Sequence, residues 1–74
     1  MQRREQEKRV ERIREQYPPG TRLQMEHMDD PYAPVPPGTQ GTVVFVDDAG
    51  QVHMEWDNGG SLAIIPGVDR FHSI

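Results

Sequence analysis

The sequence has no cysteine among its 74 residues, which excludes a disulfide framework and a thiolate metal site. It also has no long hydrophobic run. No segment approaches the roughly 18 consecutive apolar residues of a membrane span, and the N-terminus has no apolar signal region. We therefore expect a soluble, unprocessed and cytoplasmic chain. It is long enough for one small domain with a modest core, because domains of this size bury only about 60% of their unfolded surface.

Basic side chains are almost absent from most of the chain. Residues 17–74 contain only Arg22 and Arg70 against eight carboxylates, a net charge of −6, whereas residues 1–16 contain six basic and four acidic side chains, a net charge of +2. Nucleic acid binding requires a positive face that neutralises phosphates. Any contact with RNA or DNA would therefore use the N-terminal arm, where interleaved charges favour a solvated helix.

Residues 1–16 also lack glycine and proline and are rich in Glu, Gln, Lys and Arg, which predicts a charged N-terminal helix. The only apolar stripe on this helix consists of Val10, Ile13 and Tyr17, which is too narrow to stabilise it in isolation. We expect its last turn to dock, either on the rest of the chain or on another chain. The two prolines after Tyr17 end the helix, because neither has an N–H to donate.

The remaining residues, 17–74, contain short segments whose patterns predict β-strands: TRLQMEHM, GTVVFV, QVHMEW and SLAII, with VDRFHSI as one more strand or a turn. In the third segment Val52, Met54 and Trp56 alternate with polar residues, so they are expected on the core face. Four or five short strands with tight turns and no helix between them predict a mainly β fold. The preferred topology is a small SH3-like antiparallel barrel.

Two glycines are expected to close hairpin turns. Gly50 ends the sequence DDAG and suits the left-handed position of a short hairpin loop. Asn58 and Gly59 form the strongest signal for a two-residue hairpin, a type I′ turn with positive φ at both positions. Together with Trp56 on the core face, these residues are predicted to be structural.

Four blocks of residues 17–74 are specific enough to compare with known families: YPPGTRL, MDDPYAPVPPGTQGTV, VDDAGQVHMEWDNGGSL and IPGVDRF. Together they resemble the bacterial domain-of-unknown-function family 4314. The resemblance implies a small SH3-like barrel, often encoded on plasmids, conjugative elements and prophages, with no established activity and no catalytic residues to carry over. The stretch GTVVFVDDAGQVHMEW also resembles the strand, turn and strand of translation-type SH3-like modules that touch RNA.

Catalytic and metal-binding residues are scarce. A serine nucleophile would be Ser61 with one of three histidines as its base, but Ser61 follows a turn, where serine commonly makes local hydrogen bonds. His53, Glu55 and Asp57 lie on one strand face about 6.6–7 Å apart along the strand, too far for most three-ligand sites. His27, with Asp29 and Asp30, is a second small cluster. We expect no enzyme activity, no metal and no cofactor.

The sequence DDPYAPVPPGT contains four prolines in eleven residues and predicts a long, stiff surface loop, with residues 31–37 as its rigid part. The candidate partner-binding residues are Asp29, Asp30, Tyr32, Pro34 and Pro36. Acidic groups there would attract a basic ligand, and a tyrosine offers a flat amphipathic contact. In an alternative interpretation Tyr32 and Val35 fold back to complete a small core.

These patterns favour a non-enzymatic interaction module that binds a protein or peptide through the acidic Pro/Tyr-rich loop and the N-terminal helix. The partner is expected to be a basic or proline-containing peptide, or a second copy of the chain that associates through the helix. The alternative is an RNA- or DNA-associated accessory module of a mobile element that uses the basic arm. No membrane partner is expected.

Overall fold

The computed structural model describes residues 2–30, 32 and 34–74. Three residues lie outside this description: Met1, Pro31 and Ala33. The predicted N-terminal arm is therefore described from Gln2 onward, and two positions of the predicted rigid segment, residues 31–37, are not described. The described elements are one helix and four strands: α1 (Gln2–Gln16), β1 (Arg22–His27), β2 (Gln40–Val46), β3 (Val52–Trp56) and β4 (Arg70–Ser73). No helix in these ranges is long and apolar enough to cross a membrane.

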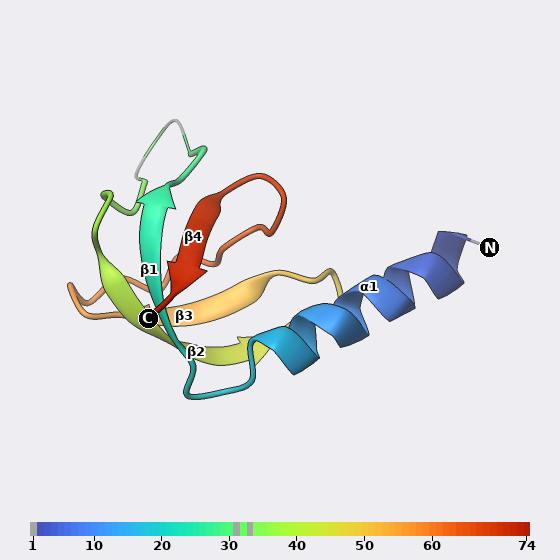
Figure 1. The fold of residues 1–74 in the computed structure, drawn as a ribbon. Helices are drawn as coiled ribbons and strands as arrows, with labels where there is room; N and C mark the ends of the chain where they lie inside the picture. The colour runs from blue at the N-terminus through green and yellow to red at the C-terminus, as the bar shows by residue number, and fades with distance from the viewer. Residues whose placement is uncertain (1, 31, 33) are drawn as a thin grey trace.

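The four strands form one antiparallel sheet in the order β3-β2-β1-β4. Figure 1 shows this sheet with α1 running outward from one end of it. The predicted mainly β body with an N-terminal charged helix is confirmed.

The sheet is not closed into a barrel, because its edge strands β3 and β4 are not joined to each other within the described ranges. The predicted strand SLAII meets β3 only at a bridge between Val52 and Ile64. Instead of continuing the ladder, the Leu62 carbonyl accepts a hydrogen bond from Trp56 Nε1 at 2.8 Å. The indole N–H of Trp56 therefore occupies the Leu62 carbonyl, which a longer strand paired with β3 would use in the ladder.

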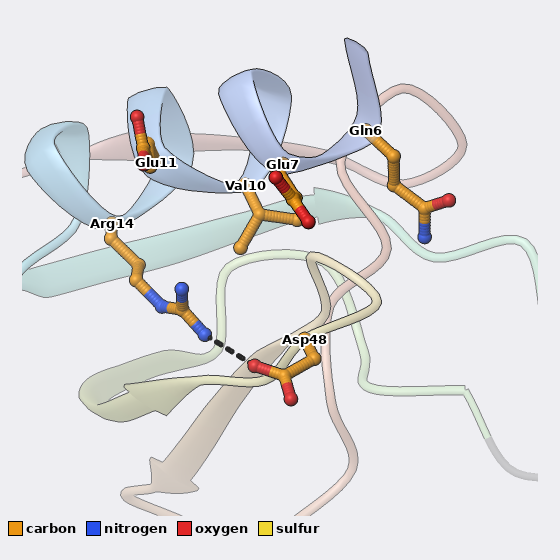
Figure 2. Close-up of a pocket in the computed structure, with 6 residues that line it drawn as sticks. All are labelled: Gln6, Glu7, Val10, Glu11, Arg14 and Asp48. Atoms are coloured by element: carbon orange, nitrogen blue, oxygen red, sulfur yellow. Dashed lines mark hydrogen bonds and ion pairs between the residues drawn. The ribbon is translucent and has the colours of Figure 1, made fainter. Parts of the chain in front are cut away.

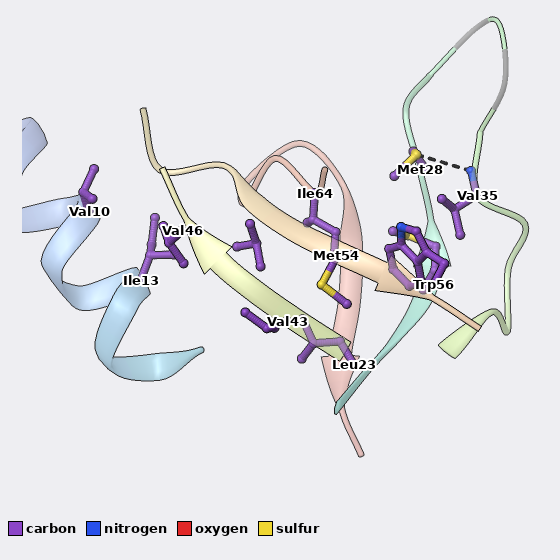
Figure 3. Packing of buried hydrophobic residues seen from close by; sticks show 12 residues of the cluster. Val10, Ile13, Leu23, Met28, Val35, Val43, Val46, Met54, Trp56 and Ile64 are labelled. Carbon is purple, nitrogen blue, oxygen red and sulfur yellow. Dashed lines mark hydrogen bonds between the residues drawn. The ribbon is translucent and has the colours of Figure 1, made fainter. Parts of the chain in front are cut away.

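The core lies on one face of the sheet and beneath α1, and Figure 3 shows its residues: Val10, Ile13, Leu23, Met25, Met28, Val35, Val43, Val46, Val52, Met54, Trp56 and Ile64. The alternation predicted for β3 is confirmed, and residues 22–25 of β1 alternate between the core and the surface in the same way. In β2 the pairing with β3 shifts between Val43 and Phe45. As a result Val44 and Phe45 are both exposed, and Val46 returns to the core.

The two predicted hairpin turns have different outcomes. Gly50 adopts a φ of +85° and its N–H donates to the Asp47 carbonyl, as a left-handed glycine at the end of a hairpin loop should. The prediction of a type I′ turn at Asn58 and Gly59 is wrong, because only Gly59 has a positive φ, +93°. The Asn58 side chain instead accepts a hydrogen bond from the Gly60 N–H at 3.0 Å, which stabilises a longer loop.

Helix α1 docks on its own chain. Val10 and Ile13 are buried, and both lie near Gly50, where a Cβ atom would be 3.3 Å from Ile13 Cδ1. Tyr17 is half-buried, and its ring centroid lies 5.3 Å from that of Phe71. The predicted apolar stripe therefore packs on the body that follows it.

Candidate functional site

The loop between β1 and β2, residues 28–39, is firmly held at its base, and we call it the Pro/Tyr loop. Met28 and Val35 are both buried, and the Val35 N–H donates to Met28 Sδ at 3.3 Å (Figure 3). Where the loop returns, the Gly38 N–H donates to the Met25 carbonyl at 2.7 Å. Val35 therefore belongs to the core, as the alternative interpretation expects.

Asp69 fixes the start of the same loop. Its side chain is only 8% exposed; Oδ1 accepts the Asp29 N–H at 2.9 Å, and Oδ2 accepts the Ile65 N–H at 2.8 Å. A carboxylate that accepts two backbone N–H groups is well satisfied when buried. The sequence pattern does not single out Asp69, and its only local signal is a position just after the Pro66-Gly67 turn.

Tyr32 stands outside the core, with 93% of its surface exposed. Its N–H donates to Asp30 Oδ1 at 2.8 Å, so the backbone beside the ring is held by a local turn. Pro34, Pro36 and Asp29 are exposed, and Asp30 is half-buried. The predicted partner-binding residues thus lie on one anchored loop, and Tyr32 is available for contact rather than part of the core.

Two of the three histidines lie beside one carboxylate each. His53 Nε2 lies 2.8 Å from Asp47 Oδ2, and His72 Nδ1 lies 3.0 Å from Glu26 Oε2. In the part of the chain that the structure describes, no group of three or more His, Cys, Asp or Glu residues could hold a metal ion. Ser61 is exposed in the loop after β3.

An open cleft of about 440 Å³ lies between α1 and the turn after β2. Figure 2 shows its lining residues: Gln6, Glu7, Val10, Glu11, Arg14 and Asp48. Arg14 forms an ion pair with Asp48 at 2.9 Å and also donates to the Val46 carbonyl at 3.3 Å. On another side of the helix, Arg9 donates to the Pro66 carbonyl at 3.2 Å. Two guanidinium groups of the basic arm are therefore used to attach the helix.

Hydrogen bonds lower the pKa of two body carboxylates. The pKa of Asp47 is lowered, first by the hydrogen bond with His53 and then by the backbone N–H groups of residues 51 and 49. The pKa of Asp57 is lowered by its two hydrogen bonds from Arg22, at 2.8 and 2.6 Å, and the same contact raises the pKa of Arg22. Both carboxylates remain charged at neutral pH, in keeping with the acidic character of residues 17–74.

Comparison with protein families gives a match that covers nearly the whole chain. The model of the family described as Domain of unknown function (DUF4314) matches residues 6–74. No curated protein and no solved structure matches the chain. The matched range contains the Pro/Tyr loop, Asp69 and the docked turns of α1, so the site and its supports lie within the family's domain.

Proposed function

This chain belongs to the DUF4314 family of domains of unknown function, and we propose that it is a non-enzymatic interaction module. It binds a protein partner through the Pro/Tyr loop, with Tyr32 as the central contact. The observation that carries the proposal is an aromatic ring that is 93% exposed on a loop whose two ends are fixed to the core.

The anchoring of the loop matters because binding has an entropic cost. A loop whose two ends are already fixed to the core loses less conformational freedom on association than one with free ends. Tyrosine adds a large amphipathic contact with only two side-chain torsions to fix. Single aromatic residues of this kind often contribute 2 kcal/mol or more, as an order of magnitude, at the centre of an interface. Tyr32 meets these conditions, whereas Trp56, the larger aromatic, is buried.

The charge of the loop and of the body defines the chemistry of the partner. Asp29 and Asp30 precede Tyr32, and residues 17–74 carry eight carboxylates against two basic side chains, a net charge of −6. A basic rim around an apolar pocket on the partner would complement this surface and accelerate encounter.

The absence of cysteine suits a reducing compartment, so we place the partner in the cytoplasm. The stripe of Val10, Ile13 and Tyr17 is already packed on the body, so a second copy could not use it while α1 stays docked.

The direct test is photo-cross-linking in the cell that makes the protein. Tyr32→p-benzoylphenylalanine keeps an aromatic ring at the tip of the loop. Ile74→p-benzoylphenylalanine is the control, because Ile74 is exposed and its backbone bond to Arg22 is retained. We expect a discrete protein adduct at position 32 and not at position 74. An adduct profile that is the same at both positions, or none at position 32, would count against the proposal.

A second candidate function, nucleic acid binding through α1, has one favourable observation. The N-terminal end of α1 points away from the sheet, and Arg4, Lys8 and Arg12 are exposed on it (Figure 1). Glu5 and Glu7 are exposed on the same turns and offset these charges. The test is an RNA and DNA titration of the wild type and of Arg4→Gln/Lys8→Gln/Arg12→Gln. A steep salt dependence that the triple variant loses would support this function over the first.

A further inference from the structure

A second exposed aromatic lies at the opposite end of the core from the Pro/Tyr loop. The register shift in β2 turns Phe45 outward, where it is 48% exposed. Beside it is an open groove of about 250 Å³, lined by Arg14, Tyr17, Pro19, Phe45 and Val46, which we call the Phe45 groove. Figure 3 shows Val46 and the helix at one end of the core and Met28 and Val35, the base of the Pro/Tyr loop, at the other.

The Phe45 ring is held in place. It stacks on the imidazole of His53 with ring centroids 4.2 Å apart and an interplanar angle of 5°. His53 is in turn bonded to Asp47 at 2.8 Å, and the other oxygen of Asp47 accepts backbone N–H groups of the turn. Because His53 covers one face of the ring, only the other face and the edge are open to a ligand. An aromatic surface fixed in this way loses little freedom on binding.

Arg14 is the one charged residue among those that line the Phe45 groove, and its charge is paired with that of Asp48. Arg14 is already engaged by Asp48 and by the Val46 carbonyl, so it contributes mainly its aliphatic stem to the groove. The Asp48 side chain is fully exposed and uses only Oδ1 for Arg14, so Oδ2 faces solvent in the described structure. The net charge of −6 on residues 17–74 adds a longer-range attraction for basic groups.

We propose that the Phe45 groove binds an extended, proline-containing peptide segment of a partner protein that also carries lysine or arginine. Grooves lined by aromatic side chains and proline accept polyproline-type segments, which are already extended and have little entropy to lose. The groove is smaller than the roughly 300–1,000 Å³ of typical small-molecule pockets, which suits one or two peptide side chains. A second copy of this acidic chain is disfavoured by like-charge repulsion.

The test is an amide NMR titration of the full chain with short synthetic peptides in which a Pro-X-X-Pro segment is flanked by arginines. Peptides with glutamate in place of arginine are the control. We expect saturable shifts at Tyr17, Phe45 and Val46 with the basic peptides and much weaker binding of the acidic ones. Absence of shifts at these residues, or equal binding of both peptide sets, would overturn the proposal.

Two variants separate this groove from the rest of the surface. Phe45→Ser should weaken binding of the basic peptides about tenfold or more, and Asp48→Asn, whose amide oxygen can still accept the hydrogen bond from Arg14, should weaken it less. Val44→Ser is the matched control, because Val44 is exposed to a similar degree on the same strand and is not among the residues that line the groove. Shifts confined to residues 28–39 would refute this groove while supporting the Pro/Tyr loop. Concentration-dependent dimerisation that Phe45→Ser abolishes would identify a second copy as the occupant and overturn the peptide proposal.

Discussion

Docking of α1 on the sheet predicts a specific loss of stability when Ile13 is shortened. Ile13 is only 7% exposed and its Cδ1 lies over Gly50. Ile13→Ala removes three carbon atoms, and at about 0.8 kcal/mol for each buried methylene this amounts to about 2.4 kcal/mol of unfolding free energy. The residual cavity adds to that loss, and settling of the helix toward the sheet subtracts from it. We therefore expect a loss of about 2 kcal/mol.

The assay is urea unfolding followed by the fluorescence of Trp56, the single tryptophan, which is buried at the far end of the core. With a urea dependence of about 1 kcal/mol/M for a domain of this size, the midpoint should fall by about 2 M. Arg12→Ala is the control, because Arg12 is exposed on the same helix and its loss should change stability by about 0.5 kcal/mol or less. An Ile13→Ala midpoint equal to that of the wild type would refute the docking of α1.

Two further predictions concern the sheet and its charged turn. Gly41→Ala should destabilise the fold by about 3 kcal/mol, because the new Cβ would lie 2.7 Å from Trp56 Cε3 and 2.9 Å from a backbone oxygen. Gly38→Ala should cost only about 1–2 kcal/mol, because its new Cβ would have no atom within 4 Å and only the φ of +88° opposes the change. If urea unfolding gave the reverse order of stability for the two variants, it would contradict the packing. The hydrogen bond with His53 lowers the pKa of Asp47 in the folded state. The ionised Asp47 carboxylate therefore contributes fully to stability above the usual carboxyl pKa of about 4, and this contribution is lost as the pH falls through the lower pKa of the folded state. The stability difference between wild type and Asp47→Asn should therefore shrink on acidification from about pH 6 to about pH 3, and a difference that stays constant in urea midpoints would refute it.

Local sequence patterns predict an element correctly where its packing and pairing partners favour the same conformation. The alternation in β1 and β3 survives in the structure because each strand has one face on the core. Alternation alone does not locate the exposed pair Val44 and Phe45, because the shift arises from pairing with β3. The turn at Asn58 departs from its local signal for a similar reason. The side chain of Asn58 bonds the Gly60 N–H, and the Trp56 N–H reaches the Gly60 carbonyl, which together favour a longer loop.

The candidate site also has features that the sequence pattern predicts and features that depend on contacts between distant residues. Sequence pattern identifies the Pro/Tyr loop but does not distinguish Tyr32 from Val35, since both are apolar residues between prolines. The distinction comes from Met28, which provides a buried surface for Val35. Asp69 anchors the loop from 40 positions away in the sequence, a distance at which no local pattern operates.

The central claim is that Tyr32 is the main contact with a protein partner, and the most direct test is the affinity of the partner identified by cross-linking. Its Kd should be measured for the wild type, Tyr32→Ala, Asp30→Asn and the control Ile74→Ser. Asp30→Asn keeps the oxygen that accepts the Tyr32 N–H and removes only the charge. We predict that Tyr32→Ala weakens binding by about tenfold or more, that Asp30→Asn weakens it less, and that Ile74→Ser leaves it unchanged. An affinity of Tyr32→Ala equal to that of the wild type, with the fold intact, would contradict the claim.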